Sequence, residues 1–213
     1  MPLQPRERIL LIGDSITDAG RSRDVPHAND RPALGAGYAM LAAAELLAEQ
    51  PGAALEIFNR GISGNRVTDL AERWRADCLD LRPTLLSVLI GVNDTWHGFK
   101  HGVGVPLDEY ERVYRDLLKQ AVAELEPLRL VLCEPFVLRT GQVTDAWFPE
   151  FDQRREIVRK LADEFDAIFV PFQAMFDRAC EQAPPSYWAG DGVHPTLAGH
   201  RRMSRLWVEK VLG

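Results

Sequence analysis

A serine near the start of the chain and a histidine near its end are residues that could do chemistry together. Ser15 ends a short apolar run in "LLIGDSITDAG" (residues 10–20), and Asp191 and His194 lie three residues apart in "AGDGVHPT" (189–196). A serine hydroxyl becomes a good nucleophile when a histidine removes its proton, and a carboxylate usually orients that histidine. These three residues therefore predict nucleophilic attack by a serine, as in the cleavage of an ester.

Acyl transfer also needs hydrogen-bond donors that face the negative oxygen of the transition state, and loss of one donor costs about 3 kcal/mol. The candidates are the backbone N–H of Ser15, the backbone N–H of Gly64 and the side-chain amide of Asn93. Glycine at position 64 would let the backbone approach closely without a Cβ in the way. Asp14 and Asp94 either tune this site or, more simply, bind turn amides that hold Ser15 and Asn93 in place.

A second serine competes for the role of nucleophile. Ser63 lies in "GISGN" (61–65), which resembles the G-x-S-x-G nucleophile elbow but has Asn65 where the elbow needs glycine. We interpret Ser63 as a turn residue that shapes the approach of Gly64. Asn65 is predicted to cap the helix that follows.

Three further histidines have simpler interpretations. His200 follows His194 by six residues inside the last predicted helix, so we expect it to face away from the catalytic residues, in packing or at the surface. His97 and His101 flank "GFK" in what we interpret as a loop after the third strand. They are predicted to be exposed loop residues, with a place on the rim of the pocket as the alternative.

Four aromatic residues could bind a substrate. Trp96, Trp147 and Trp188 lie in segments expected near the mouth of the site, where an indole ring can stack on a sugar or on an apolar acyl chain. Packing in the core or at an interface explains each of them equally well. Tyr38, at the start of the first long helix, has the same two interpretations.

The elements that must position these residues alternate between strands and helices. Nearly continuous apolar runs, typical of strands covered on both faces, occupy residues 8–13, 54–59, 85–91, 128–135 and 167–172. Helical periodicity occupies residues 38–50, 67–80, 106–125, 150–165 and 196–212. This alternation predicts right-handed βαβ units, a parallel sheet with helices on both sides, and a ligand crevice at the carboxyl ends of the strands. The long connections 17–37 and 136–151 carry no assigned role.

Composition restricts the classes of function. A chain of 213 residues without a linker or repeat is interpreted as one domain, 1–213, and its 46% hydrophobic and 26% charged residues are ordinary for a globular protein. The net charge of −6 argues against a nucleic-acid partner, because phosphate binding requires a basic face.

Cysteine usage and the amino-terminal segment bear on location and cofactors. Cys78, Cys133 and Cys180 are widely spaced, which favours reduced thiols over a disulfide framework and resembles no zinc site. The first apolar run is too short for a signal peptide, and no segment has the length of a membrane span. We therefore expect a cytoplasmic protein without a membrane partner, a metal or an organic cofactor, and the sequence leaves self-association open.

Four blocks of the sequence resemble those of the SGNH (GDSL-type) hydrolases. They are "GDSIT" (13–17), Gly64 in "GISGN", "GVND" (91–94) and "DGVHP" (191–195), in the family's order and across nearly the whole chain. Ile16 departs from the leucine of the name GDSL, a difference that is frequent in the bacterial esterases. The resemblance implies a flavodoxin-like α/β/α sandwich with five parallel strands.

The resemblance also implies roles for individual residues. The four signature positions would be Ser15, Gly64, Asn93 and His194, with Asp191 completing a catalytic triad. Within the family the chain looks most like small bacterial carbohydrate acetyl esterases of the acetylxylan esterase type.

The expected function is therefore a serine esterase acting on small short-chain esters, with acetylated oligosaccharides as the implied substrates. Fold and triad do not choose the acyl group, so a lysophospholipase or thioesterase is the first alternative. A non-catalytic flavodoxin-like binding module is the second, although neither a G-x-x-x-x-G-K-[ST] nor a G-x-G-x-x-G motif follows the first strand.

Overall fold

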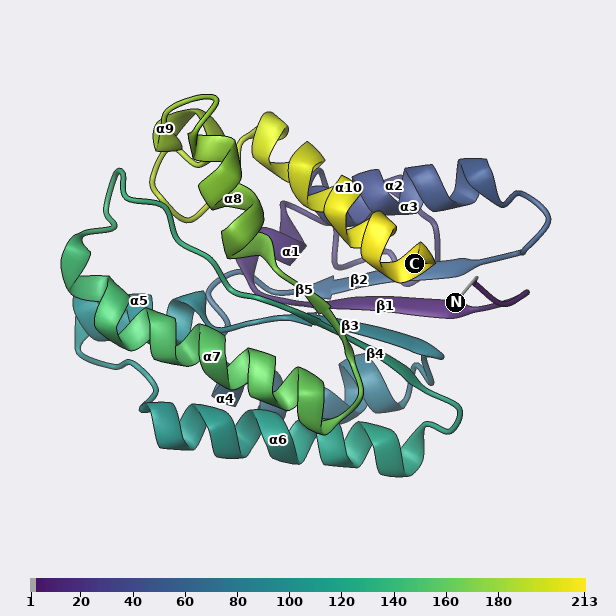
Figure 1. Ribbon diagram of the computed structural model, residues 1–213. Coiled ribbons are helices and arrows are strands. Elements are labelled where there is room, and N and C mark those ends of the chain that lie inside the picture. The colour runs from purple at the N-terminus through teal and green to yellow at the C-terminus, as the bar shows by residue number, and fades with distance from the viewer. Residues whose placement is uncertain (1–2) are drawn as a thin grey trace.

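The apolar runs form a parallel sheet in the computed structural model, which describes residues 3–213 (Figure 1). Its strands are β1 (Arg8–Gly13), β2 (Glu56–Gly61), β3 (Leu85–Leu89), β4 (Arg129–Cys133) and β5 (Ile168–Val170). Their spatial order is β2-β1-β3-β4-β5, and every neighbouring pair is parallel. All carboxyl ends therefore meet at one edge, and the predicted five-stranded α/β/α sandwich is confirmed.

Helices cover both faces of the sheet (Figure 1). One layer contains α3 (Tyr38–Glu49), α8 (Phe172–Cys180) and α10 (Leu197–Leu212), with the short helices α1 (Ser15–Asp18), α2 (Arg31–Leu34) and α9 (Pro185–Trp188) beside them. The opposite layer contains α4 (Val67–Glu72), the π-helical turn η1 (Arg75–Leu79), α6 (Leu107–Glu124) and α7 (Phe148–Glu164). The helix α5 (Val92–His101) and the 3₁₀ turn η2 (Asp145–Trp147) lie near the carboxyl ends of the strands.

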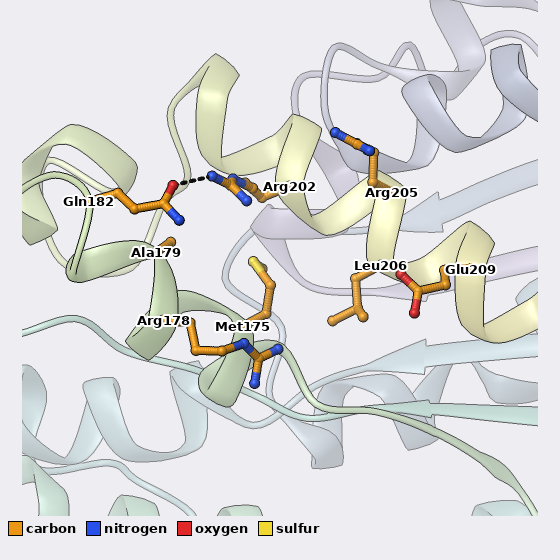
Figure 2. Close-up of a pocket in the computed structure, with 8 residues that line it drawn as sticks. All are labelled: Met175, Arg178, Ala179, Gln182, Arg202, Arg205, Leu206 and Glu209. Carbon is orange, nitrogen blue, oxygen red and sulfur yellow. Dashed lines mark hydrogen bonds between the residues drawn. The ribbon is translucent and has the colours of Figure 1, made fainter.

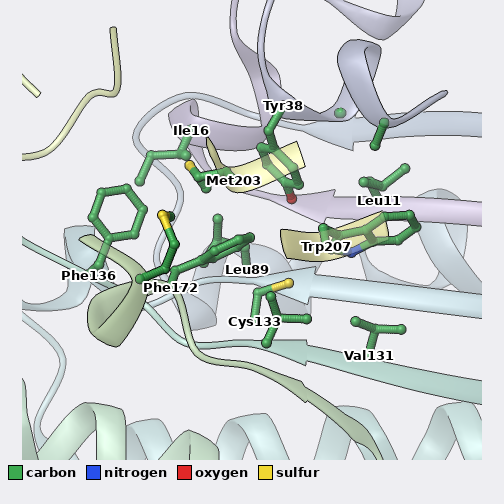
Figure 3. Packing of buried hydrophobic residues seen from close by; sticks show 14 of the residues in the cluster. Leu11, Ile16, Tyr38, Leu89, Val131, Cys133, Phe136, Phe172, Met203 and Trp207 are labelled. Carbon is green, nitrogen blue, oxygen red and sulfur yellow. The ribbon is translucent and has the colours of Figure 1, made fainter. Parts of the chain in front are cut away.

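Each central strand is buried on both faces, which explains its unbroken apolar sequence. Along β1, Leu11 packs in the cluster under α3 and α10, whereas Leu10 packs in the cluster above α6. Figure 3 shows the first cluster, where Trp207 of α10 lies over the sheet. The buried Trp207 Nε1 donates to the hydroxyl of Ser87 in β3 at 2.8 Å, so the polar group in this strand is satisfied.

The helix predictions differ from the structure in several regions. Residues 172–180, for which no helix was expected, form α8, and the short helices α1, α2 and α9 were not expected either. The predicted helix 67–80 is interrupted after α4 and continues as η1. Segment 92–101 was expected to be a loop but forms α5, which begins after Gly91 and ends at Gly102 in the left-handed conformation. Its polar composition and the internal Gly98 hide the helical period. The three cysteines are unpaired, with Cys78 and Cys133 buried and Cys180 partly buried.

Candidate active site

The serine, histidine and aspartate singled out in the sequence form a continuous hydrogen-bonded chain. Ser15 Oγ lies 2.9 Å from His194 Nε2, and His194 Nδ1 lies 2.6 Å from Asp191 Oδ2. The first contact joins residues 179 positions apart, from the end of β1 and from the segment before α10. The geometry is that of a nucleophile, a base and an orienting carboxylate.

A tight turn fixes Asp191 relative to the histidine. Asp191 Oδ1 accepts hydrogen bonds from the backbone N–H groups of Val193 (2.9 Å) and His194 (2.8 Å). Burial would raise the pKa of the Asp191 carboxyl, but hydrogen bonds from His194 and from these N–H groups outweigh it and hold the pKa below its ordinary value. The connection 136–151 supports this turn, since Leu138 N–H donates to the carbonyl of Gly192 at 2.8 Å.

Ser15 is the first residue of α1, and Asp14 is its N-cap. Asp14 Oδ1 accepts from the backbone N–H of Ile16 at 2.9 Å, which is the turn-amide role predicted for it. Burial raises the pKa of the Asp14 carboxyl to about 7; the Ile16 hydrogen bond opposes this rise, and the negative charge of Asp94 adds to it. Because first-turn N–H groups have no acceptor within the helix, the Ser15 N–H remains available to a ligand.

The other two predicted oxyanion donors lie at the same crevice. Gly64 has φ +85°, and a Cβ built there would meet no atom within 4 Å. The backbone conformation therefore favours glycine here, since no protein atom crowds the position. Asn93 Nδ2 donates to the carbonyl of Asn65 at 3.1 Å, a contact that orients the amide at the start of α5.

Ser15 and these donors share a crevice of about 290 Å³. One face of α5 forms a side of it, because Asn93, Trp96 and His97 recur at helical spacing. The Trp96 ring lies 5.6 Å from the His194 ring, between their centroids, so it borders the reacting groups. The residues that line the crevice are Ser15, Ser63, Gly64, Asn93, Trp96, His97, Lys100, His101 and His194.

Asp94 holds the neighbouring loop rather than the turn at Asn93. Its Oδ1 accepts from the backbone N–H of Val67 at 3.0 Å, at the start of α4. Burial raises the pKa of the Asp94 carboxyl to about 6, against the opposing charge of Arg154. Arg154 is itself fully buried and donates to the hydroxyl of Thr95 at 3.1 Å. Asp94 therefore joins α5 to the start of α4.

Three of the four aromatic candidates are core residues. Tyr38 is 0% exposed, and its hydroxyl lies 3.2 Å from Thr17 Oγ1. Trp147 and Trp188 are 3% and 5% exposed, and Trp188 Nε1 donates to the carbonyl of Ala179 at 3.0 Å. Their burial leaves no ring face for a substrate, so the prediction of substrate contact is wrong for these three. Among the four candidates, Trp96 alone lines the crevice.

Other polar residues are placed as follows. His97 and His101 lie on α5 and line the crevice, which favours the rim alternative over the loop interpretation. His200 packs beside Gly37, and its Nδ1 accepts from the backbone N–H of Tyr38 at 3.1 Å, as expected of a packing residue. Burial lowers the pKa of His200 to about 4, and the charge of His194 adds to this effect.

The loop that contains Gly64 is held by side chains that the sequence interpretation missed. Arg66, not Asn65, is the N-cap of α4, so the capping prediction was wrong. Asn65 Oδ1 instead accepts from Arg73 Nε at 2.6 Å, and Arg73 Nη2 donates to the carbonyl of Gly13 at 3.0 Å. Arg73 lies in "AERWR" (71–75), within a predicted helix, where an arginine is usually a surface residue. No local pattern indicates that it binds the end of a strand.

A second depression of about 320 Å³ lies between α8 and α10 and shares no residue with the crevice (Figure 2). Arg178, Arg202 and Arg205 stand around Met175 and Leu206 there, without a nucleophile or a histidine. Within residues 3–213, no group of three or more His, Cys, Asp or Glu side chains could hold a metal ion. No helix in that range combines the length and apolar character needed to cross a membrane.

Comparisons with known proteins also indicate an ester hydrolase. The model of the GDSL-like lipase/acylhydrolase family matches residues 11–202. The chain is 36% identical to the acetylxylan esterase of Geobacillus stearothermophilus, and the alignment covers 99% of this chain and 96% of that enzyme.

Solved structures extend the agreement to the fold. A protein from Parabacteroides merdae described as a GDSL-like lipase is 46% identical and has a TM-score of 0.95, covering 98% of this chain and 96% of that one. A catalytic mutant of the Geobacillus acetylxylan esterase, with a serine changed to alanine, is 34% identical and has a TM-score of 0.90, covering 99% and 96%. The fold is that of the SGNH hydrolases, and the chain belongs to the GDSL-like lipase/acylhydrolase family as a carboxylic ester hydrolase.

Proposed function

We propose that this chain hydrolyses acetyl and other short-chain esters, including those of acetylated oligosaccharides, through Ser15, His194 and Asp191. The observation that carries the proposal is the hydrogen-bonded chain from Ser15 Oγ through His194 to Asp191, which ends in a crevice with donors for an oxyanion. The similarity to an acetylxylan esterase over 99% of the chain supports the acetyl group and the saccharide.

In the first half of the reaction, Ser15 Oγ attacks the ester carbonyl carbon while His194 Nε2 takes its proton. Asp191 stabilises the imidazolium that forms and keeps the ring oriented. The carbonyl oxygen becomes an oxyanion that accepts hydrogen bonds from Ser15 N–H, Gly64 N–H and Asn93 Nδ2. The imidazolium then gives its proton to the leaving alcohol, and the acyl group remains on Ser15.

The second half releases the acyl group with the same residues. A water molecule takes the position of the alcohol, and His194 removes a proton from it as it attacks the acyl-enzyme. The same donors stabilise the second oxyanion. Collapse of that intermediate breaks the bond to Ser15 Oγ, and the serine recovers its proton from His194.

The shape of the crevice supports a small acyl group. The long connection 136–151 is packed against the Asp191 turn, and Leu138 and Val143 are buried there rather than presented as an apolar lid. A lipid-directed lysophospholipase would need apolar surface for a long chain, so the first alternative lacks a feature that favours it. Trp96 gives the crevice a partly exposed aromatic wall suited to a sugar ring.

The proposal is tested with acetyl and octanoyl p-nitrophenyl esters and with a panel of acetylated xylo-oligosaccharides. We expect the wild type to prefer acetyl over octanoyl esters and Ser15→Ala to lose kcat by about 10⁴-fold or more. Ser63→Ala, which changes the rival serine in the same crevice, is the matched control and should lose no more than about fivefold in kcat. A Ser15→Ala variant with wild-type turnover would remove this serine from the mechanism, and a wild type that a fluorophosphonate probe fails to label would favour a binding module.

A further inference from the structure

We propose that Asp18 is a positioning residue that fixes the Gly64 N–H relative to Ser15 by tying Ser63 to α1. The inference rests on the proposed function and extends it to a residue that contacts neither the substrate nor the triad. Asp18 is 3% exposed and lies at the carboxyl end of α1, one turn beyond Ser15.

The Asp18 carboxylate accepts four hydrogen bonds. Its Oδ2 accepts from Ser63 N–H at 2.9 Å, from Ser63 Oγ at 3.0 Å and from Arg23 Nη2 at 3.0 Å. Its Oδ1 accepts from the backbone N–H of Arg21 at 3.1 Å. Two of the four bonds reach the residue directly before Gly64. The carboxylate therefore ties the oxyanion loop to the helix that begins with the nucleophile.

Other contacts join the end of β2 to the end of β1 and to α1, but they do not reach Ser63. Asn59 Nδ2 in β2 donates to the carbonyl of Thr17 at 2.6 Å, and Ile62 N–H donates to the carbonyl of Gly13 at 3.0 Å. A Cβ at Gly61 would lie 2.2 Å from the backbone nitrogen of Asp18, so α1 rests directly on the end of β2. Beyond Gly61 the loop turns toward the crevice, and Asp18 fixes it there through Ser63.

The chemistry of the site requires a carboxylate rather than an amide. The donors around Oδ2 are two from Ser63 and one from Arg23, and Arg21 N–H faces Oδ1, so an amide NH₂ at this site would face a donor in either orientation. Burial would raise the pKa of the Asp18 carboxyl, but the hydrogen bonds from Ser63 and Arg23 outweigh it and lower the pKa below its ordinary value. Asp18 therefore carries its negative charge throughout the neutral pH range.

The test compares Asp18→Asn with Glu134→Gln. Glu134 is also 3% exposed and also accepts from a backbone N–H (Gln173, 3.0 Å) and from an arginine (Arg155 Nε, 3.0 Å), but it holds α8 and does not line the crevice. We expect both variants to lose thermal stability. Asp18→Asn alone should lower kcat on p-nitrophenyl acetate, by about 10- to 100-fold, while KM changes by less than about twofold, because a displaced donor acts on the transition state.

A second measurement separates positioning from general loosening of the fold. The adduct of a boronic acid with the active-site serine places an oxygen in the oxyanion hole, so its Ki reports on the donors. We expect the Ki of phenylboronic acid to rise in Asp18→Asn by about the factor by which kcat falls, and to stay at the wild-type value in Glu134→Gln. Equal kcat and equal Ki in the two variants would overturn the proposal.

If Asp18→Asn does not fold, Ser63→Ala carries the test. This variant loses the Ser63 Oγ hydrogen bond at 3.0 Å but keeps the N–H bond at 2.9 Å, so kcat should fall about two- to fivefold and the boronic acid Ki should rise with it. An unchanged Ki would contradict the positioning role. A wild type without esterase activity would contradict the proposed function itself, which is a different result from an active wild type with an indifferent Asp18.

Discussion

The two edges of the parallel sheet contain buried polar groups of different character. At the amino edge, Glu7 is 3% exposed and pairs with Arg129, whose Nε donates to it at 3.2 Å. Arg8 pairs with Glu56 at 2.6 Å, although both of these side chains are partly exposed. At the carboxyl edge, burial raises the pKa values of Asp14 and Asp94 to about 7 and about 6.

Unmatched polar atoms are found at the carboxyl edge as well. Within residues 3–213, Asp94 Oδ2 and Arg154 Nη1 are buried without a hydrogen-bond partner. Two glycines in left-handed backbone regions, Gly64 and Gly91, follow strands at the same edge. Buried unpaired groups cost stability. We therefore expect the amino edge to contribute to stability and the carboxyl edge to the proposed oxyanion hole.

The largest expected difference between the edges concerns asparagine side chains. Asn93→Ala should lower kcat on acetyl esters by about 10²- to 10³-fold, since it removes a donor to the oxyanion. Asn29 is the matched residue near the amino end of β2, where it binds the backbone of Leu55 (2.7 Å) and of Ile57 (2.9 Å). Asn29→Ala should lower the melting temperature and leave kcat unchanged. Steady-state kinetics and thermal unfolding of both variants check this, and equal kcat values would contradict it.

The next effect is on the pH dependence of stability. Asp14 has an ordinary pKa of 3.8, raised by burial to about 7 in the folded protein. The folded state therefore binds a proton that the unfolded state releases, and the stability that Asp14 contributes is present below pH 4 and lost as pH rises through 7. Asp14→Asn keeps an oxygen for Ile16 N–H without the charge. Its free energy of unfolding relative to wild type should therefore increase by about 2 kcal/mol between pH 5 and pH 8.

Asp191→Asn gives the opposite sign and serves as the control. The pKa of Asp191 is below its ordinary value, so its contribution to stability is present above pH 4 and lost as pH falls through its folded pKa. Urea unfolding from pH 3 to pH 8 should therefore show Asp14→Asn gaining stability relative to wild type between pH 5 and pH 8. Asp191→Asn should instead lose stability relative to wild type as the pH rises to about 4, with no further change above it. Parallel curves for Asp14→Asn and wild type would show that folding does not raise the pKa of Asp14.

Most of the fold could be predicted from the sequence because buried parallel strands have unbroken apolar runs. The contacts among Ser15, His194 and Asp191 could be predicted because Ser15 follows a strand and because Asp191 and His194 are only three residues apart. Local patterns did not reveal long-range ties such as Asp18 to Ser63, because a single polar residue in a loop has the same appearance whether it is exposed or buried.

The aromatic residues show the same limitation. Trp96 and Trp147 both lie in segments that were expected near the mouth of the site. Trp96 lines the crevice, whereas Trp147 stacks on Phe99 with ring centroids 5.3 Å apart. Which side of a ring stays open depends on how α5 packs, and α5 itself was hidden by its polar composition. Burial of individual rings follows from tertiary packing and is not encoded in the local period.

The smallest predicted effect is at the amino edge. Arg8 Nη2 pairs with Glu56 at 2.6 Å, and Arg8 Nη1 donates to the carbonyl of Leu81 at 2.8 Å. The side chains of Arg8 and Glu56 are 35% and 45% exposed, so water screens their charges. Arg8→Met should therefore cost about 1 kcal/mol, which lowers the melting temperature by about 2–4 °C in a protein of this size. Because Ser15 follows the carboxyl end of β1, kcat on p-nitrophenyl acetate is the decisive measurement. An unchanged kcat supports the separation of the two edges. A fall of more than about threefold would show that a change at the amino end of the strand reaches Ser15.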